Sequence, residues 1–172
     1  MKKRLMMLAW LLMAVMGMQA QSLIGTWKTE VELEGIDKAA YSFIFTKDAY
    51  SMKGNFTMTV GEVATVDFSF LAPGSYTREG DKLNIKCNID KAVIKLDKVV
   101  FLGEAAEEVE KNPELKEELT KQLKAGIEAS RDEAVGEFPE TQDFTIISLT
   151  DTKLTLKDSD DDETVFTKVG ER

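Results

Sequence analysis

Histidine is absent from this 172-residue sequence, and cysteine occurs only once, at Cys87. Without histidine, the chain cannot build a Ser–His or Cys–His nucleophile pair or a histidine-containing zinc site. A single cysteine also excludes an intramolecular disulfide bond. In the segment KLNIKCNID, Cys87 has the same strand parity as Leu83 and Ile85, so we expect a buried, unreactive side chain. The sequence therefore predicts no catalytic residue, no metal site and a fold that relies on its apolar core.

The chain also lacks a cluster of basic residues interleaved with aromatic residues, and a glycine-rich loop between a strand and a helix. Its 22 Lys and Arg are outnumbered by 31 Asp and Glu, and the net charge of −9 repels nucleic-acid phosphates. The missing glycine-rich loop removes the usual signature of a phosphate cradle. A carboxylate pair could support glycoside hydrolysis, but Asp67 lies on the polar face of its strand. We therefore expect no nucleic-acid partner, no cofactor and no enzymatic activity.

The first 20 residues have the layout of a secretory signal peptide. A basic start, KKR, precedes an apolar run from Leu5 to Val15, and the small residue Ala20 marks the expected cleavage point. The alternative is a membrane anchor, but the apolar run is shorter than the roughly 20 residues that a spanning helix needs. No cysteine follows the run, so a lipoprotein anchor is not expected. We predict a periplasmic or secreted protein whose residues 21–172 form a single domain.

Apolar and polar residues alternate with a period of two from residue 23 to about 101, and again in DFTIISLT, KLTLKD and ETVFTKV. Trp27, Val31 and Leu33, for example, share one face of the first run. This alternation is typical of antiparallel strands with one buried face, and turn signals such as EGD separate the runs. The regular, short strand spacing suggests a meander that closes into a barrel or a sandwich. Because closure removes exposed sheet edges, we predict an all-β, up-and-down barrel of about eight to ten strands.

Residues 104–132 interrupt this pattern and are predicted to be an α-helical insertion. Asn112 is a natural N-cap, and Pro113 suits the first helical position. Apolar residues then recur at every fourth position and form one narrow stripe, while most other positions are polar. We expect this stripe to dock the insertion against the barrel, as a lid or a side brace: Leu115, Leu119, Leu123 and Ile127.

The acidic segment DSDDDE resembles the start of a calcium-binding loop. Asp158, Asp160 and Asp162 match the first three ligand positions of an EF-hand. However, Glu163 replaces the required glycine, and Val169 stands where a bidentate glutamate is needed. We interpret the segment as a solvated hairpin tip, with weak cation binding as the alternative.

Several sequence segments resemble segments of the lipocalin and calycin barrels, and in particular of the lipocalin-like domains of exported bacterial proteins. They are LIGTWK in the first strand, the hairpin GSYTREGDKLNIK and the C-terminal IISLTDTKLTLKDSDDDETVFTKV. The resemblance covers about residues 23–169 and implies that Gly25 and Trp27 lie at the closed end, with Trp27 plugging the barrel floor. The family stacks a basic residue from a late strand on this tryptophan, and Lys168 is the nearest candidate.

The resemblance also implies binding of a small apolar molecule, and we expect this noncatalytic function. An alternative is a filled barrel that serves as a protein-interaction or inhibitor module, and a third hypothesis is an enzyme with converging carboxylates. Alternating apolar positions in the central strands are predicted to point into the barrel. The residues expected to face a ligand there are Phe43, Phe45, Phe56, Met58, Phe68 and Phe70.

Overall fold

The computed structural model describes residues 22–129, 131 and 139–170, so the predicted signal peptide lies outside the described residues. The described chain forms nine strands, two α-helices and one 3-10 turn. Their order is β1 (Gly25–Leu33), β2 (Ile36–Phe45), β3 (Tyr50–Val60), β4 (Ala64–Glu79), β5 (Lys82–Cys87), η1 (Ile89–Lys91), β6 (Val93–Phe101), α2 (Gly103–Lys111), α3 (Pro113–Ala129), β7 (Thr141–Leu149), β8 (Lys153–Lys157) and β9 (Glu163–Val169).

Eight of the strands close into a barrel. Neighbours along the sheet follow the order β3-β2-β1-β9-β8-β7-β5-β4, and β4 pairs back onto β3. All of these pairings are antiparallel, and β6 is a ninth strand added beside β4. The predicted fold class, an antiparallel lipocalin-like barrel with an inserted helical segment, is confirmed.

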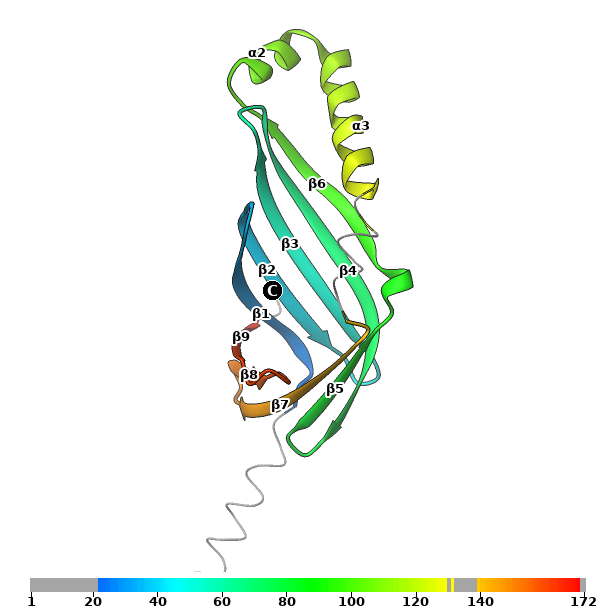
Figure 1. Ribbon diagram of the computed structural model, residues 1–172, viewed down its shortest axis with the longest axis vertical. Helices are drawn as coiled ribbons and strands as arrows, with labels where there is room; N and C mark the ends of the chain where they lie inside the picture. The colour runs from blue at the N-terminus through cyan, green and yellow to red at the C-terminus, as the bar shows by residue number, and fades with distance from the viewer. Residues whose placement is uncertain (1–21, 130, 132–138, 171–172) are drawn as a thin grey trace, which may run out of the picture.

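The barrel is closed at one end and open at the other because β4 pairs with two different strands, β5 and β6, along the same edge. Gly74–Glu79 of β4 pair with β5, whereas Ala64–Leu71 pair with β6. On the far side, β1 pairs with β9 only over Thr26–Lys28. Beyond these points the sheet continues without closing, and Figure 1 shows β3, β4 and β6 extending past the barrel towards α2.

The closed end is filled with side chains. A continuous apolar cluster joins residues from the barrel strands and includes the aromatic rings of Trp27, Phe45 and Tyr50, each exposed by 1% or less. Phe43 lies in the same cluster, with its ring centroid 4.7 Å from that of Phe166 and 5.4 Å from that of Tyr50. Dense packing of this kind is the main source of stability in a chain that has one cysteine.

The helical segment covers the open end. Asn112 caps α3 as predicted, because the backbone N–H of Leu115 donates to its side-chain oxygen at 3.2 Å. The predicted leucine and isoleucine stripe of α3 packs in a second apolar cluster, together with the buried residues Val66, Phe101 and Val109. Figure 1 shows α3 running alongside β6, above the closed barrel. Among the described residues, neither helix has the length and apolar content to cross a membrane.

Candidate ligand-binding site

An apolar pocket of about 490 Å³ lies between α3 and the open part of the sheet. Register places its strand residues on one face, because Met58 pairs with Val66, and Ala64 pairs with both Val60 and Phe101. This face continues the inner face of the barrel, since Val66 and Phe68 have the same parity on β4 as the core residues Phe70 and Ala72. The sheet side of the pocket consists of Met58 and Val60 of β3, Val63 of the following turn, Ala64, Val66 and Phe68 of β4, and Ile94 and Phe101 of β6.

The helix side of the pocket is formed by one face of α3. It consists of Leu119, Gln122, Leu123, Gly126 and Ile127, which recur at helical spacing. A Cβ atom added at Gly126 would meet no other atom within 4 Å, so the pocket is open at this point of the helix. No described residue of α3 is fully buried, and its leucines and isoleucine are only half-buried. The helix therefore leaves part of its apolar stripe uncovered.

The chemistry of the lining is apolar apart from one amide. Gln122 is the single polar residue among the described residues that line the pocket, and none of them is Lys, Arg, Asp or Glu. The side-chain Nε2 of Gln122 donates a hydrogen bond to Oε1 of Glu118, one helical turn away, at 2.9 Å. Such a lining can bury a hydrocarbon surface, but it supplies no ionised group for acid–base or nucleophilic chemistry.

Arg131, which follows α3 in the chain, contacts η1 and Ala92, the residue that precedes β6. Its Nε donates to the carbonyl of Ala92 at 3.0 Å, and one terminal nitrogen donates to the carbonyls of Ile89 and Asp90 at 3.3 and 3.0 Å. At the near end, the backbone N–H of Leu102 donates to the carbonyl of Val63 at 2.8 Å. The helical segment is thus held to η1 and Ala92 at one end and to the β3–β4 turn at the other.

The six residues nominated from the sequence separate into two groups. Met58 and Phe68 line the pocket. Phe56 does not line it: it packs against the closed-end cluster and stacks on Phe68, with ring centroids 5.0 Å apart. Phe43, Phe45 and Phe70 belong to the packed cluster of the closed end and do not line this pocket.

Several lining residues were missed by sequence reasoning. Ile94, Phe101, Gln122 and Gly126 line the pocket but were not among the residues expected to face a ligand. Gly126 was the available signal, because a glycine inside a helix destabilises it by about 0.5–1 kcal/mol relative to alanine and usually has a packing reason. Here Gly126 lies in the pocket lining, and an added Cβ would meet only open space.

The floor of the closed end has the arrangement that the sequence predicted for Gly25, Trp27 and Lys168. The Trp27 indole is fully buried, and its Nε1 donates to the carbonyl of Leu23 at 2.7 Å. Lys168 lies opposite Trp27 in the β1–β9 register, and its Nζ is 5.1 Å from the centroid of the indole ring. The packed floor and the pocket are therefore at different ends of the molecule.

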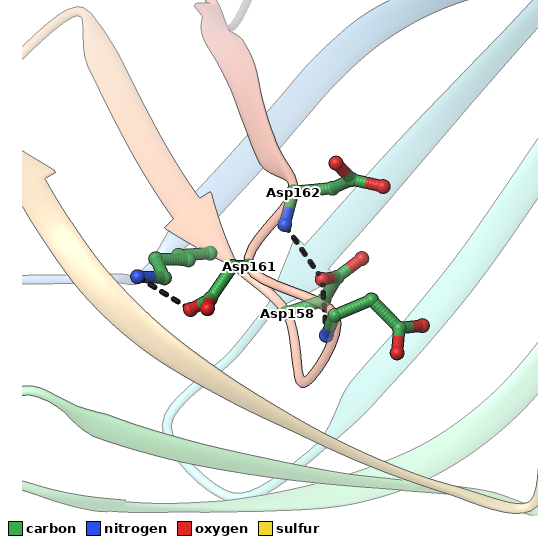
Figure 2. A network of polar contacts seen from close by, with 5 residues as sticks. Asp158, Asp161 and Asp162 are labelled. Carbon is green, nitrogen blue, oxygen red and sulfur yellow. Dashed lines mark hydrogen bonds and ion pairs between the residues drawn. The ribbon is translucent and has the colours of Figure 1, made fainter.

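The acidic hairpin tip is organised by its own backbone. One oxygen of the Asp158 carboxylate accepts the backbone N–H groups of Asp160 and Asp162 at 2.9 and 3.0 Å, and Lys157 pairs with Asp161 at 2.6 Å (Figure 2). Within the described ranges, no group of three or more acidic or cysteine side chains is arranged to hold a metal ion. The geometry is that of an Asx turn between two strands.

Cys87 is buried, as the sequence predicted, with 3% of its surface exposed. Burial raises the pKa of its thiol above the usual value because the thiolate is poorly solvated there. A buried thiol with a raised pKa is a poor nucleophile, so Cys87 contributes to packing at the closed end.

Two solved structures are similar to this chain. One is a lipocalin-like protein from Bacteroides uniformis, with 15% sequence identity, coverage of 86% of this chain and 98% of that chain, and a TM-score of 0.37. The other is an uncharacterized protein from Bacteroides eggerthii, with 17% identity, coverage of 86% and 100%, and a TM-score of 0.39. No protein-family model and no curated protein matches the chain. The fold assignment rests on the strand pairing of the chain itself.

Proposed function

We propose that this chain binds one small apolar molecule, without transforming it, in the pocket between α3 and the open part of the sheet. The observation that carries the proposal is the combination of volume and lining. A volume of about 490 Å³ falls within the range of roughly 300–1,000 Å³ that is usual for small-molecule sites. The lining is apolar except for Gln122.

The incomplete packing of α3 supports the same function. Leu119, Leu123 and Ile127 are half-buried, and α3 has no fully buried residue among those described. An apolar ligand would cover the exposed part of these side chains and gain about 25 cal/mol for each Å² removed from water. Binding should therefore complete the apolar cluster beneath the helix and stabilise the docked position of α3.

The proposed place of action is outside the cytoplasm. The support is the leader in residues 1–20, with its basic start, short apolar run and small residue at the expected cleavage point. Expression of the full-length chain in a bacterial host, followed by N-terminal sequencing of the exported product, tests this part. A product that begins near residue 21 is expected, and retention of the intact leader in the cytoplasm would contradict it.

Native mass spectrometry of the purified mature chain tests the binding function. The expected spectrum contains a one-to-one complex with a small molecule, which is lost after organic extraction. A fluorescent apolar probe should then bind to the extracted protein with one-to-one stoichiometry. A spectrum of the bare chain, combined with no binding of the probe, would overturn the proposal.

The filled-barrel interaction module is the second candidate function. The observation in its favour is the solidly packed closed end, where Trp27, Phe45 and Leu154 are almost completely buried. If the pocket takes no small molecule in the experiment above, the acidic surface of the protein together with the helix becomes the better candidate for a binding face, and the interaction module replaces the ligand carrier.

A further inference from the structure

We infer that the pocket takes up a hydrocarbon chain from the side, so that its ligand is an elongated apolar molecule that can carry a bulky polar group at each end. This inference rests on the proposed function, because it concerns the ligand of the same pocket. It is carried by the exposure of the lining residues, which is high along one edge of the pocket and very low along the other.

The buried edge of the pocket lies where α3 packs against β6. The two elements are in contact, and Figure 1 shows the helix running alongside this strand. The lining residues here are shielded from water, because Ala64 and Val66 of β4 are each exposed by only 1% and Phe101 of β6 by 9%. A ligand therefore has no path into the pocket between α3 and β6.

The open edge of the pocket is marked by four lining residues that remain exposed. Val60, the last residue of β3, is 37% exposed, and Val63 in the following turn is 48% exposed. Gln122 and Gly126 of α3 are also exposed, and a Cβ atom at Gly126 would meet open space. Since β3 and β6 flank β4 on opposite sides, the exposed strand residue lies away from the edge that α3 closes.

The exposed residues are spread along the whole pocket. Val63 lies at the end where Ala64 pairs with Phe101. Gly126 lies near the opposite end, because the chain just after α3 returns to Ala92, at the start of β6, through Arg131. The pocket is consequently a groove that is open along its length, and not a cavity with a mouth at one end.

The length of the groove indicates the size of the chain that it covers. On α3 the lining runs from Leu119 to Ile127, which is about 12 Å along the helix axis. On β4 it runs from Ala64 to Phe68, which is about 13 Å along the strand. An extended hydrocarbon chain of about ten carbons has a similar length, given carbon–carbon bonds of about 1.5 Å.

Sideways entry decides which ligands are admitted. A cavity with one mouth has to be threaded, so at least one end of its ligand must be small and apolar. In a groove that is open along its edge, the chain is laid in from the side and both ends leave into water. Polar groups at the two ends then keep their hydration, which avoids the cost of burying them among side chains that offer no charged partner.

Competition between a one-headed and a two-headed ligand with the same chain tests the inference. N-phenyl-naphthylamine, an uncharged fluorophore, is bound to the mature protein and displaced by decyl glucoside or by decane with a glucose at each end, both below micelle formation. The second glucose affects at most about one buried carbon, worth roughly fourfold in affinity, so the two displacement constants should agree within about tenfold. Butane with a glucose at each end is the control and should not displace the probe.

The possible failures are distinguishable. Displacement by decyl glucoside alone would show that the ligand is threaded from one end, which would overturn the inference and leave the proposed function intact. Displacement by the butane control would show recognition of the sugar and would also overturn it, as would a bound probe that neither decyl compound displaces. A probe that does not bind would remove the proposed function itself.

The kinetics of probe binding provide a second test. Entry through an edge that is already open does not require α3 to leave β6. The observed rate of binding in stopped-flow fluorescence should therefore rise in proportion to the concentration of N-phenyl-naphthylamine, with no plateau. A rate that levels off at high concentration would show that a slow opening of the protein precedes binding, and would overturn sideways entry.

Discussion

Nζ of Lys168 lies 5.1 Å from the centroid of the Trp27 ring, and the same lysine side chain passes directly over Gly25. A Cβ atom on Gly25 would lie 2.6 Å from Cε of Lys168, so the end of the flexible lysine side chain would have to move to admit it. Gly25 also has a φ of +134°, a conformation that residues with a side chain rarely adopt. The glycine of the Gly-Thr-Trp motif therefore makes room for the lysine that covers the tryptophan.

Gly25→Ala is expected to destabilise the protein by about 1–3 kcal/mol, because alanine is strained at this φ. The new methyl group should also push the end of Lys168 away from the indole. Chemical denaturation measures the first effect, and a change in tryptophan fluorescence reports the second. In the background of Lys168→Ala, the cost of Gly25→Ala should be smaller, because the steric conflict is gone. If Gly25→Ala lowered the free energy of unfolding equally in the wild type and in Lys168→Ala, the position of Lys168 would not depend on a glycine at residue 25.

Trp27→Ala is expected to cost about 3–5 kcal/mol, because it removes a fully buried aromatic ring and leaves a cavity at the barrel floor. Trp27→Phe keeps most of the ring and loses the Nε1 hydrogen bond to Leu23, so its cost should be clearly lower. Urea titrations of both variants and of the wild type provide the comparison. A loss below about 1 kcal/mol for Trp27→Ala would be incompatible with a tryptophan that fills the floor.

Arg131→Met should loosen the end of α3, because it removes charged donors from the carbonyls of Ile89, Asp90 and Ala92. Hydrogen bonds from charged groups contribute about 1.5–3 kcal/mol, so amide exchange in α3 should become at least tenfold faster while the barrel strands stay protected. Lys124→Met is the matched control, since Lys124 is exposed and makes only a long ion pair with Glu128 at 3.8 Å. Unchanged exchange in Arg131→Met would show that the contact does not hold the helix.

Asp158→Ala is expected to destabilise the β8–β9 hairpin by about 1 kcal/mol, because two backbone N–H groups lose their acceptor. Asp158→Asn retains an acceptor oxygen and should recover most of this loss. Thermal unfolding of both variants is the measurement, with Asp160→Ala as the control for removal of one negative charge from the same turn. If Asp160→Ala were as damaging as Asp158→Ala, the charge of the turn and not the Asp158 cap would be responsible.

The strands and the helix could be predicted because their patterns are local. Alternation around Trp27 and along β4 identifies the buried faces, and the spacing of Leu119, Leu123 and Ile127 identifies the docking face of α3. Asn112 and Pro113 mark the start of α3 from sequence alone, and the structure places the cap where they predicted it. These features depend on residues within a few positions of each other.

The position of the pocket could not be predicted because it depends on long-range pairing. Met58 and Phe43 both lie on inward-facing positions of neighbouring strands, yet Phe43 is in the packed core and Met58 faces the pocket. The difference arises because β4 changes its partner from β5 to β6 along one edge, which opens the sheet beyond the barrel. The change of partner falls at Pro73 and Gly74, but these residues do not by themselves specify which strand pairs on either side. Parity alone therefore assigned all six residues to one interior.

The most direct test of the ligand pocket is titration of the mature protein with N-phenyl-naphthylamine in the wild type, in Gly126→Leu and in Ala125→Leu. Gly126 belongs to the pocket lining and has open space beside it, so we expect a leucine there to occupy part of the pocket. The leucine should also favour the helix by up to about 1 kcal/mol, so the variant should fold. Leucine at the exposed position 125 lies outside the lining. Saturable one-to-one binding in the wild type and in Ala125→Leu, with at least tenfold weaker binding in a folded Gly126→Leu, is the predicted result. Equal binding by all three proteins would contradict the assignment of the ligand to this pocket.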